Sequence, residues 1–119
     1  MALETLDAGS WAGFLKAPAA VLVLGKSDCP ACSDWSAELD RFLASDTAWS
    51  HVRFGKLLLD QRGLIEFKRA NPWIAGLETL PHNGLFRDGA RVAEFAGAGV
   101  ERLAARLERV FGAPPQPAA

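Results

Sequence analysis

A continuous run of apolar residues, Ala19 to Leu24, ends at Gly25 and constrains the fold of this chain more than any other feature. A strand with one buried face alternates apolar and polar residues, whereas an unbroken apolar run of this length is typical of a strand buried on both faces. We therefore expect this strand in the middle of a sheet, with helices covering both sides.

Helical and strand patterns alternate on either side of that run. Apolar spacing, proline and glycine positions predict helices over 7–16, 30–44, 63–70 and 100–111, a second strand over 51–60, and a hairpin whose strands include 85–86 and 92–95. The Asp88-Gly89 pair between the last two segments is a strong turn signal. This order predicts an α/β domain whose central sheet combines parallel strands with an antiparallel hairpin.

The chain has 119 residues, which is the length of one ordinary domain. We expect that domain to cover residues 1–112. The last segment, residues 113–119, reads A-P-P-Q-P-A-A, and this proline-rich composition predicts a disordered tail.

Charge is nearly balanced along the chain, with 13 basic and 14 acidic residues and a net charge of −1. The sequence shows neither a basic stripe of the kind that binds nucleic acid nor a polybasic segment of the kind that binds a membrane surface. The longest apolar run near the N-terminus is too short to cross a bilayer, and the start, M-A-L-E-T-L-D, lacks the positive region of a secretory signal. We therefore expect a cytoplasmic monomer with neither nucleic acid nor membrane as a partner.

Both cysteines of the chain stand in K-S-D-C-P-A-C-S-D-W, residues 26–35, where the expected central strand is followed by a helix. Cys29 would lie at the helix N-terminus, where unpaired N–H groups and the helix dipole favour the reactive thiolate. Pro30 suits the first helical turn, because the N–H groups there have no partner within the helix and proline, which lacks an N–H, therefore costs no hydrogen bond. Cys32 lies one turn on, within disulfide reach. We predict that Cys29 attacks a disulfide and that Cys32 resolves the intermediate.

Three nearby residues are candidates for modulating the thiols. The carboxylate of Asp28, directly before Cys29, disfavours the thiolate, whereas the Lys26 ammonium would favour it if it points at the sulfur. His82 follows Pro81 in the chain and is a candidate acid or base in thiol exchange.

Two other interpretations of the cysteines stay open from the residues alone. Two cysteines and two histidines match the ligand count of a structural zinc site, but His51 and His82 do not form the compact pair that such sites use. The cysteines could also be small buried core residues. We predict no metal and no other cofactor.

Two further segments complete a family resemblance. Thr79-Leu80-Pro81 precedes the hairpin, and F-R-D-G-A-R-V-A-E-F-A-G-A covers Phe86 to Ala98. With C-P-A-C after the first central strand, these segments resemble the thioredoxin superfamily over about residues 3–111. The resemblance implies a thioredoxin-like three-layer α/β fold, a mixed sheet flanked by helices. It also implies a cis bond at Pro81 that brings Leu80 beside the sulfurs, so that Leu80, Pro81 and Pro30 contact an extended substrate segment.

The activity implied by the resemblance is thiol–disulfide exchange on protein disulfides, with a reductase as a further partner. The chain departs from the family pattern in its cysteine motif and at two further positions. Thioredoxins carry W-C-G-P-C, but here Asp28 precedes the first cysteine and Pro-Ala separates the pair. The position of the family's buried acid is Val23, and that of the helix-kinking proline is Ala37. The missing acid and the adjacent Asp28 favour a second hypothesis, a thioredoxin-fold binding or adaptor module with little redox activity.

Overall fold

Strand β2 (Ala20–Gly25) occupies the middle of a five-stranded sheet, as the apolar run predicts. It pairs in parallel with β3 (Arg53–Leu58) and antiparallel with β4 (His82–Arg87). All of its residues are buried, because neighbouring strands take up its backbone groups and helices cover both of its faces.

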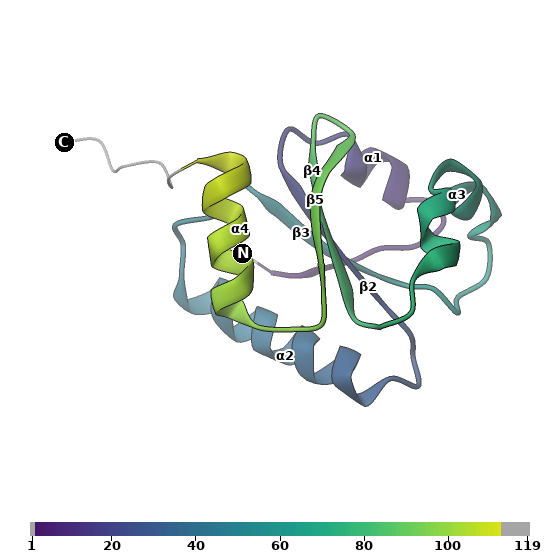
Figure 1. Ribbon diagram of the computed structural model, residues 1–119, viewed down its shortest axis with the longest axis horizontal. Coiled ribbons are helices and arrows are strands. Elements are labelled where there is room, and N and C mark those ends of the chain that lie inside the picture. Colours follow the sequence, from purple (N-terminus) through teal and green to yellow (C-terminus); the bar gives the residue numbers. More distant parts are fainter. Residues whose placement is uncertain (1, 113–119) are drawn as a thin grey trace.

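The computed structural model describes residues 2–112 (Figure 1). The remaining elements, in chain order, are β1 (Glu4–Thr5), α1 (Trp11–Leu15), α2 (Pro30–Ser45), α3 (Ile65–Ala70), the 3-10 helix η1 (Pro72–Gly76), β5 (Ala90–Ala96) and α4 (Val100–Phe111). The strands lie in the order β1-β3-β2-β4-β5, with β1 parallel to β3 and β5 antiparallel to β4. This arrangement confirms the expected mixed sheet. The expected tail, residues 113–119, lies outside the described residues.

Helices cover the sheet in two layers, α2 and α4 on one face and α1 and α3 on the other (Figure 1). Strand β2 alternates between the two cores. Val21 and Val23 pack toward Trp35 and Leu39 of α2, in a cluster that also contains Leu103 and Leu107 of α4. Ala20, Leu22 and Leu24 of β2 belong to a second cluster with side chains of α1, α3 and η1, namely Phe14, Leu15, Phe67 and Ile74. The three-layer interpretation is therefore confirmed.

Element boundaries differ from the sequence expectation in ways that tertiary pairing explains. The two-residue strand β1 and the helix η1 were not expected, since neither is long enough to carry a periodic pattern. Strand β4 begins at His82, three residues before the expected start, although Asn83 and Gly84 are poor strand formers. Full pairing of His82 through Phe86 with β2 outweighs that local preference.

No helix among residues 2–112 combines the length and the apolar character needed to span a bilayer.

The packing beside Gly55 of β3 generates a stability prediction. A Cβ atom at Gly55 would lie 2.8 Å from Leu6 Cδ1 and 2.9 Å from Phe14 Cε1, inside the buried cluster under α1. We expect Gly55→Ala to lower the free energy of unfolding by about 1–3 kcal/mol, the usual cost of overpacking. Urea unfolding followed by tryptophan fluorescence measures this change.

The matched control is Gly13→Ala in α1, where a new Cβ meets no atom within 4 Å. Alanine in a helix is favoured over glycine by about 0.5–1 kcal/mol, so this variant should be as stable as the parent or slightly more so. Equal stability of both variants would contradict the proposed tight contact at Gly55.

Candidate active site

The two cysteines lie where β2 ends and α2 begins. Cys29 is the N-cap residue of α2, and Pro30 occupies the first helical position. The Cys29 sulfur accepts a hydrogen bond from the backbone N–H of Cys32, at 3.2 Å. This N–H is one of the donors that a helix N-terminus leaves without an internal partner, so the sulfur satisfies it as a capping side chain does.

Cys29 and Cys32 form a disulfide bond, with their Cα atoms 5.2 Å apart. The two sulfurs differ in access. Cys32 is only 5% exposed, whereas Cys29 is half-buried at the surface. Cys29 is therefore the more accessible of the two sulfurs, and its role as the attacking residue stays a prediction.

Gly25, the last residue of β2, allows Cys32 to pack directly on the strand. A Cβ at Gly25 would lie 3.0 Å from the Cys32 Cβ and 3.2 Å from its sulfur. The first turn of α2 could not lie this close to any other residue type without shifting. In the sequence, Gly25 indicates only the end of a strand, and its place four residues before Cys29 is the one signal of this packing role.

The Leu80–Pro81 peptide bond lies beside Cys29 and is cis. The Leu80 carbonyl oxygen is 4.0 Å from the Cys29 sulfur, a contact and not a hydrogen bond, because a disulfide sulfur carries no proton. The Pro81 carbonyl accepts the N–H of Gly97 at 2.8 Å, which ties this segment to the end of β5. The structure thus brings Leu80 and the cysteines together, while substrate contact by Leu80, Pro81 and Pro30 stays a prediction.

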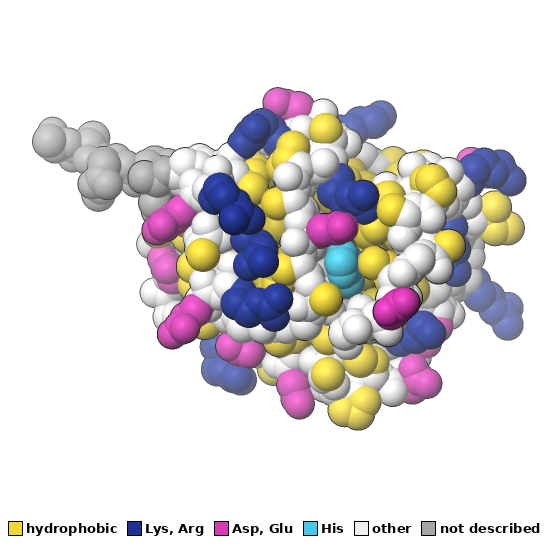
Figure 2. All heavy atoms as spheres, in the orientation of Figure 1, with side chains coloured by type: hydrophobic (Ala, Val, Ile, Leu, Met, Phe, Trp, Pro, Cys, Tyr) yellow, Lys and Arg dark blue, Asp and Glu magenta, His cyan; other side chains and the backbone are white. Residues whose placement is uncertain are grey.

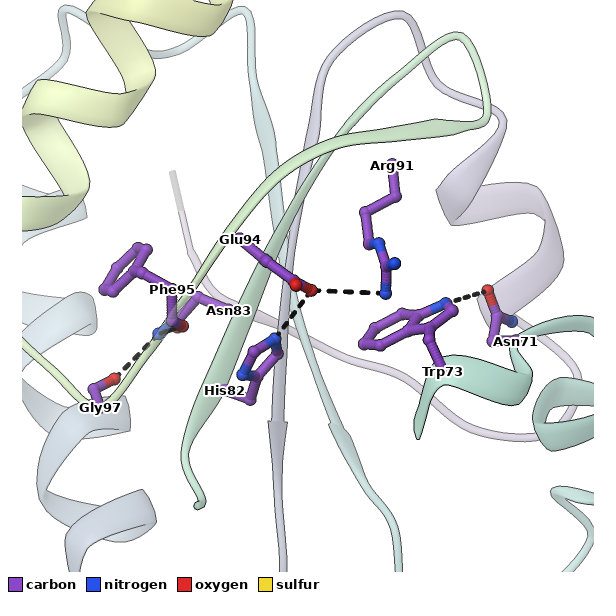
Figure 3. Close-up of polar contacts among 8 residues, drawn as sticks. All are labelled: Asn71, Trp73, His82, Asn83, Arg91, Glu94, Phe95 and Gly97. Carbon is purple, nitrogen blue, oxygen red and sulfur yellow. Dashed lines mark hydrogen bonds and ion pairs between the residues drawn. The ribbon is translucent and has the colours of Figure 1, made fainter. Parts of the chain in front are cut away.

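Asn83 joins three elements near this site, a role that was not predicted from the sequence. Its side-chain Nδ2 donates to the carbonyls of Phe95, at 3.2 Å, and Gly97, at 2.8 Å (Figure 3). Its Oδ1 accepts the indole N–H of Trp35 at 2.8 Å. Asn83 is fully buried, so these bonds link α2, β4 and β5 where water cannot replace them. A single asparagine two residues after a proline gives no sequence signal of such a role.

His82 is buried and belongs to a polar cluster on the other side of β4. Its Nε2 lies 3.2 Å from Glu94 Oε2, and Arg91 Nη1 lies 3.3 Å from the same oxygen (Figure 3). The Arg91 guanidinium in turn lies 3.9 Å from the centre of the Trp73 ring. Neighbouring residues of a strand face opposite sides, so His82 points away from the face on which Asn83 meets α2. The acid–base role expected of His82 stays a prediction.

A short loop between β2 and Cys29 carries the two charged modulators. Asp28 is exposed, and Lys26 lines two cavities. Ser27 holds the loop to the end of β3, because its hydroxyl donates to Asp60 and its N–H lies 3.2 Å from Asp60 Oδ1. The hydrogen bond from the Ser27 hydroxyl is the main reason why the pKa of the Asp60 carboxyl lies below its ordinary value. The backbone N–H of Ser27 and the charge of Lys26 act in the same direction.

One cavity is lined in part by Cys32, and a second lies beside Leu80. The smaller, about 240 Å³, lies behind Cys32 and is lined by lysines, serines and apolar residues: Val23, Gly25, Lys26, Ser27, Ser33, Ser36, Lys56 and Leu58. Val23, which pairs with Lys56 in the β2–β3 register, stands at the position where the family pattern has its buried acid, so this cavity has an apolar side chain there. The larger, about 690 Å³, extends from Leu80 and Lys26 toward α3 and η1.

The zinc interpretation finds no support in the geometry. Within residues 2–112, no three side chains of the His, Cys, Asp and Glu types come together as metal ligands. His82 faces Glu94, and His51 stacks on Trp49 with ring centres 5.7 Å apart. The buried-core interpretation does not fit Cys29, which remains partly accessible.

Comparison with solved structures places the fold. Thioredoxin f2 from Chlamydomonas reinhardtii has a TM-score of 0.74 at 21% identity, covering 96% of this chain and 99% of that chain. Spinach chloroplast thioredoxin f has a TM-score of 0.72 at 16% identity, covering 91% and 85%. Oxidised thioredoxin from Plasmodium falciparum has a TM-score of 0.71 at 12% identity, covering 94% and 100%. No family model and no curated protein matches the chain. The chain has the thioredoxin fold, and its cysteine pair fits the C-x-x-C motif.

The Ser27–Asp60 contact predicts a pH-dependent contribution to stability. The pKa of Asp60 is lower in the folded chain than in the unfolded one, where it is about 3.9. The contribution of this contact to the free energy of unfolding is therefore complete at pH values above the unfolded-state pKa, and it is lost as the pH falls through the folded-state pKa. Asp60→Asn should destabilise the protein at pH 7, and its difference from the parent should shrink below about pH 4.

Denaturant unfolding from pH 7 to pH 2.5 measures this difference. Asp40→Asn, which changes an exposed carboxylate on α2, is the control and should show a smaller effect. A difference between Asp60→Asn and the parent that stays constant across the range would contradict the assignment.

The Asn83 bonds predict a coupled effect on stability. Asn83→Leu removes the partners of one buried donor and two carbonyls, and we expect a loss of about 2–4 kcal/mol, since each buried unsatisfied group costs about 1–3 kcal/mol. In a double-mutant cycle, Trp35→Phe should cost less in the Asn83→Leu background than in the parent. Additive changes in unfolding free energy would show that the Trp35–Asn83 bond contributes nothing.

Proposed function

We propose that this protein is a thiol–disulfide oxidoreductase that acts on disulfides of other proteins. The observation that carries the proposal is the disulfide between Cys29 and Cys32 at the start of α2, with Cys29 accessible and next to the Leu80 carbonyl. The thioredoxin fold of the chain supports a redox role for such a pair.

The reaction starts from the reduced pair. The Cys29 thiolate attacks one sulfur of a substrate disulfide, the Cys29–substrate bond forms, and the second substrate sulfur leaves as a thiolate that takes up a proton. Cys32 then loses its proton and attacks the Cys29 sulfur, which breaks the mixed disulfide and releases the first substrate sulfur as a thiol. Two electrons pass to the substrate, and the protein is left with the Cys29–Cys32 bond. An external reductase would restore the dithiol.

The helix N-terminus supports the first step. Unpaired N–H groups and the helix dipole stabilise negative charge on Cys29, and the Cys32 N–H already points at that sulfur. Leu80, Pro81 and Pro30 are proposed to contact the substrate, with the Leu80 backbone pairing with an extended segment. Lys26, Asp28 and His82 are proposed to adjust thiol reactivity.

The cavity behind Cys32 favours a second candidate function. None of its lining residues is a carboxylate that could accept the Cys32 proton, and Cys32 is nearly inaccessible otherwise. A thioredoxin-fold binding or adaptor module that exchanges disulfides slowly would have such a site. We further propose a cytoplasmic monomer with protein disulfides and a reductase as partners.

Insulin reduction with dithiothreitol separates the two functions. The parent should accelerate the reaction, and Cys29→Ser should fall to the rate of dithiothreitol alone, because the attacking sulfur is gone. Ser33→Ala, in the same helical turn, is the control and should keep the parent rate. Equal rates for the parent and Cys29→Ser would favour the binding module.

In a second measurement, Cys32→Ser should accumulate a mixed disulfide between Cys29 and a protein substrate, visible as a reducible band of higher mass, because the resolving thiol is missing. An absence of that band under conditions where the parent is active would contradict the assignment of Cys32.

A further inference from the structure

Two arginines of α4, Arg102 and Arg106, stack together on one aromatic ring at the end of β5. Their guanidinium carbons lie 5.0 Å and 4.6 Å from the centre of the Phe95 ring. The two residues are four apart and so occupy one stripe of the helix, which Arg109 continues. We call Arg102, Arg106 and Arg109 the arginine stripe.

The arginine stripe is separated from the acidic residues of the same helix. Glu101 and Glu108 are seven residues apart and share a different side of α4. Figure 2 shows dark blue side chains gathered along α4 beside β5, with magenta ones toward the outer edge of the molecule. The net charge of the chain is only −1, so this local excess of positive charge reflects position and not composition.

Most donors of the two stacked arginines lack partners within the described part of the chain. Arg102 donates to the Ala98 carbonyl at 3.4 Å, and Arg106 donates to the Arg102 carbonyl at 3.2 Å. A guanidinium has five N–H donors. Among residues 2–112, neither arginine has a carboxylate oxygen within 4.0 Å, and the buried Nε of Arg106 has no hydrogen-bond partner.

Burial of Arg106 lowers the pKa of its guanidinium, and the charges of Arg102 and Arg109 lower it further. Like charges at this spacing repel each other, so an anion bound between them would relieve an existing repulsion.

The arginine stripe lies close to the loop that flanks the disulfide. A Cβ at Gly97 would lie 3.3 Å from Arg102 Nη1, and the Gly97 N–H donates to Pro81. Arg102 therefore contacts the backbone segment that holds the Leu80–Pro81 peptide beside Cys29. The cysteine site and the arginine stripe are thus connected through the Pro81–Gly97 hydrogen bond.

We propose that Arg102 and Arg106 bind carboxylates of an acidic segment that flanks the disulfide of a protein substrate. This inference rests on the proposed function, because it names the kind of substrate that the same site would select. A protein segment fits better than nucleic acid, since the positive charge forms one short stripe beside a thiol site and does not extend over a face. Guanidinium groups pair with carboxylates through two parallel hydrogen bonds, which gives recognition as well as attraction.

Two synthetic peptides test this preference. Both contain the same intramolecular disulfide, flanked by glutamates in one and by glutamines in the other, and kcat/KM for their reduction is measured with the parent protein. We expect the glutamate peptide to be reduced several-fold faster at low salt. The preference should disappear near 1 M NaCl, where the screening length is about 3 Å.

The double variant Arg102→Gln/Arg106→Gln should lose the preference and keep the parent rate on the glutamine peptide. The control Lys16→Gln/Arg41→Gln removes the same charge from exposed positions on other elements and should keep the preference. The variant Arg102→Lys/Arg106→Lys keeps the positive charge but lacks the paired guanidinium donors, so it should keep part of the preference for the glutamate peptide. Equal kcat/KM of the parent for the two peptides would overturn the proposal.

Failure of the proposed function gives a different result, in which the parent reduces neither peptide. A readout without redox chemistry then decides the inference: amide chemical shifts are followed while a glutamate peptide with its cysteines replaced by serine is added. Shifts at residues 97–106 that the glutamine peptide does not cause would support the arginine stripe as a carboxylate site. Equal or stronger shifts with a short single-stranded DNA would overturn the protein-substrate assignment.

Discussion

Direct packing of Cys32 on the backbone of Gly25 fixes where the reactive end of α2 lies. Strand β2 is buried along its whole length, and its last residue, Gly25, is held by β3, since it pairs with Leu58 and its carbonyl accepts the N–H of Leu59. Because Cys32 packs on Gly25, the position of the buried strand β2 fixes the position of the Cys32 sulfur and of the first turn of α2. A reactive pair on a loop would lack this support, and catalytic geometry tolerates little displacement.

The opposite wall of the site depends on buried polar bonds in place of close packing. Asn83 carries the connection from Trp35 of α2 to the carbonyls of Phe95 and Gly97, and Gly97 then holds Pro81. Such bonds specify one arrangement, since a shift of any partner leaves a polar group unsatisfied in a low-dielectric interior. The two walls are thus fixed by different physical means.

The sequence predicted the parts of this structure that depend on local pattern. The apolar run of β2, the cysteine at the start of α2 and the Asp88-Gly89 turn each carry their signal within a few residues. Long-range contacts left no such signal. The bonds of Asn83 join residues up to 48 positions apart. The pairing of His82 with Glu94 depends on the hairpin register, and that of Ser27 with Asp60 on the meeting of two strand ends, neither of which a single sequence reveals.

The site lies at one end of the central strands, where β2 ends, α2 begins and β4 starts. The turn between β4 and β5 lies at the opposite end of these strands, where the Asp88 N–H donates to the Pro18 carbonyl and both Asp88 and Gly89 adopt positive φ. This separation makes the exposed tip at Asp88-Gly89 a suitable place to attach a fluorophore or to tether the protein to a support. A label there would leave the approach to Cys29 unobstructed while remaining rigidly joined to the strand that supports it.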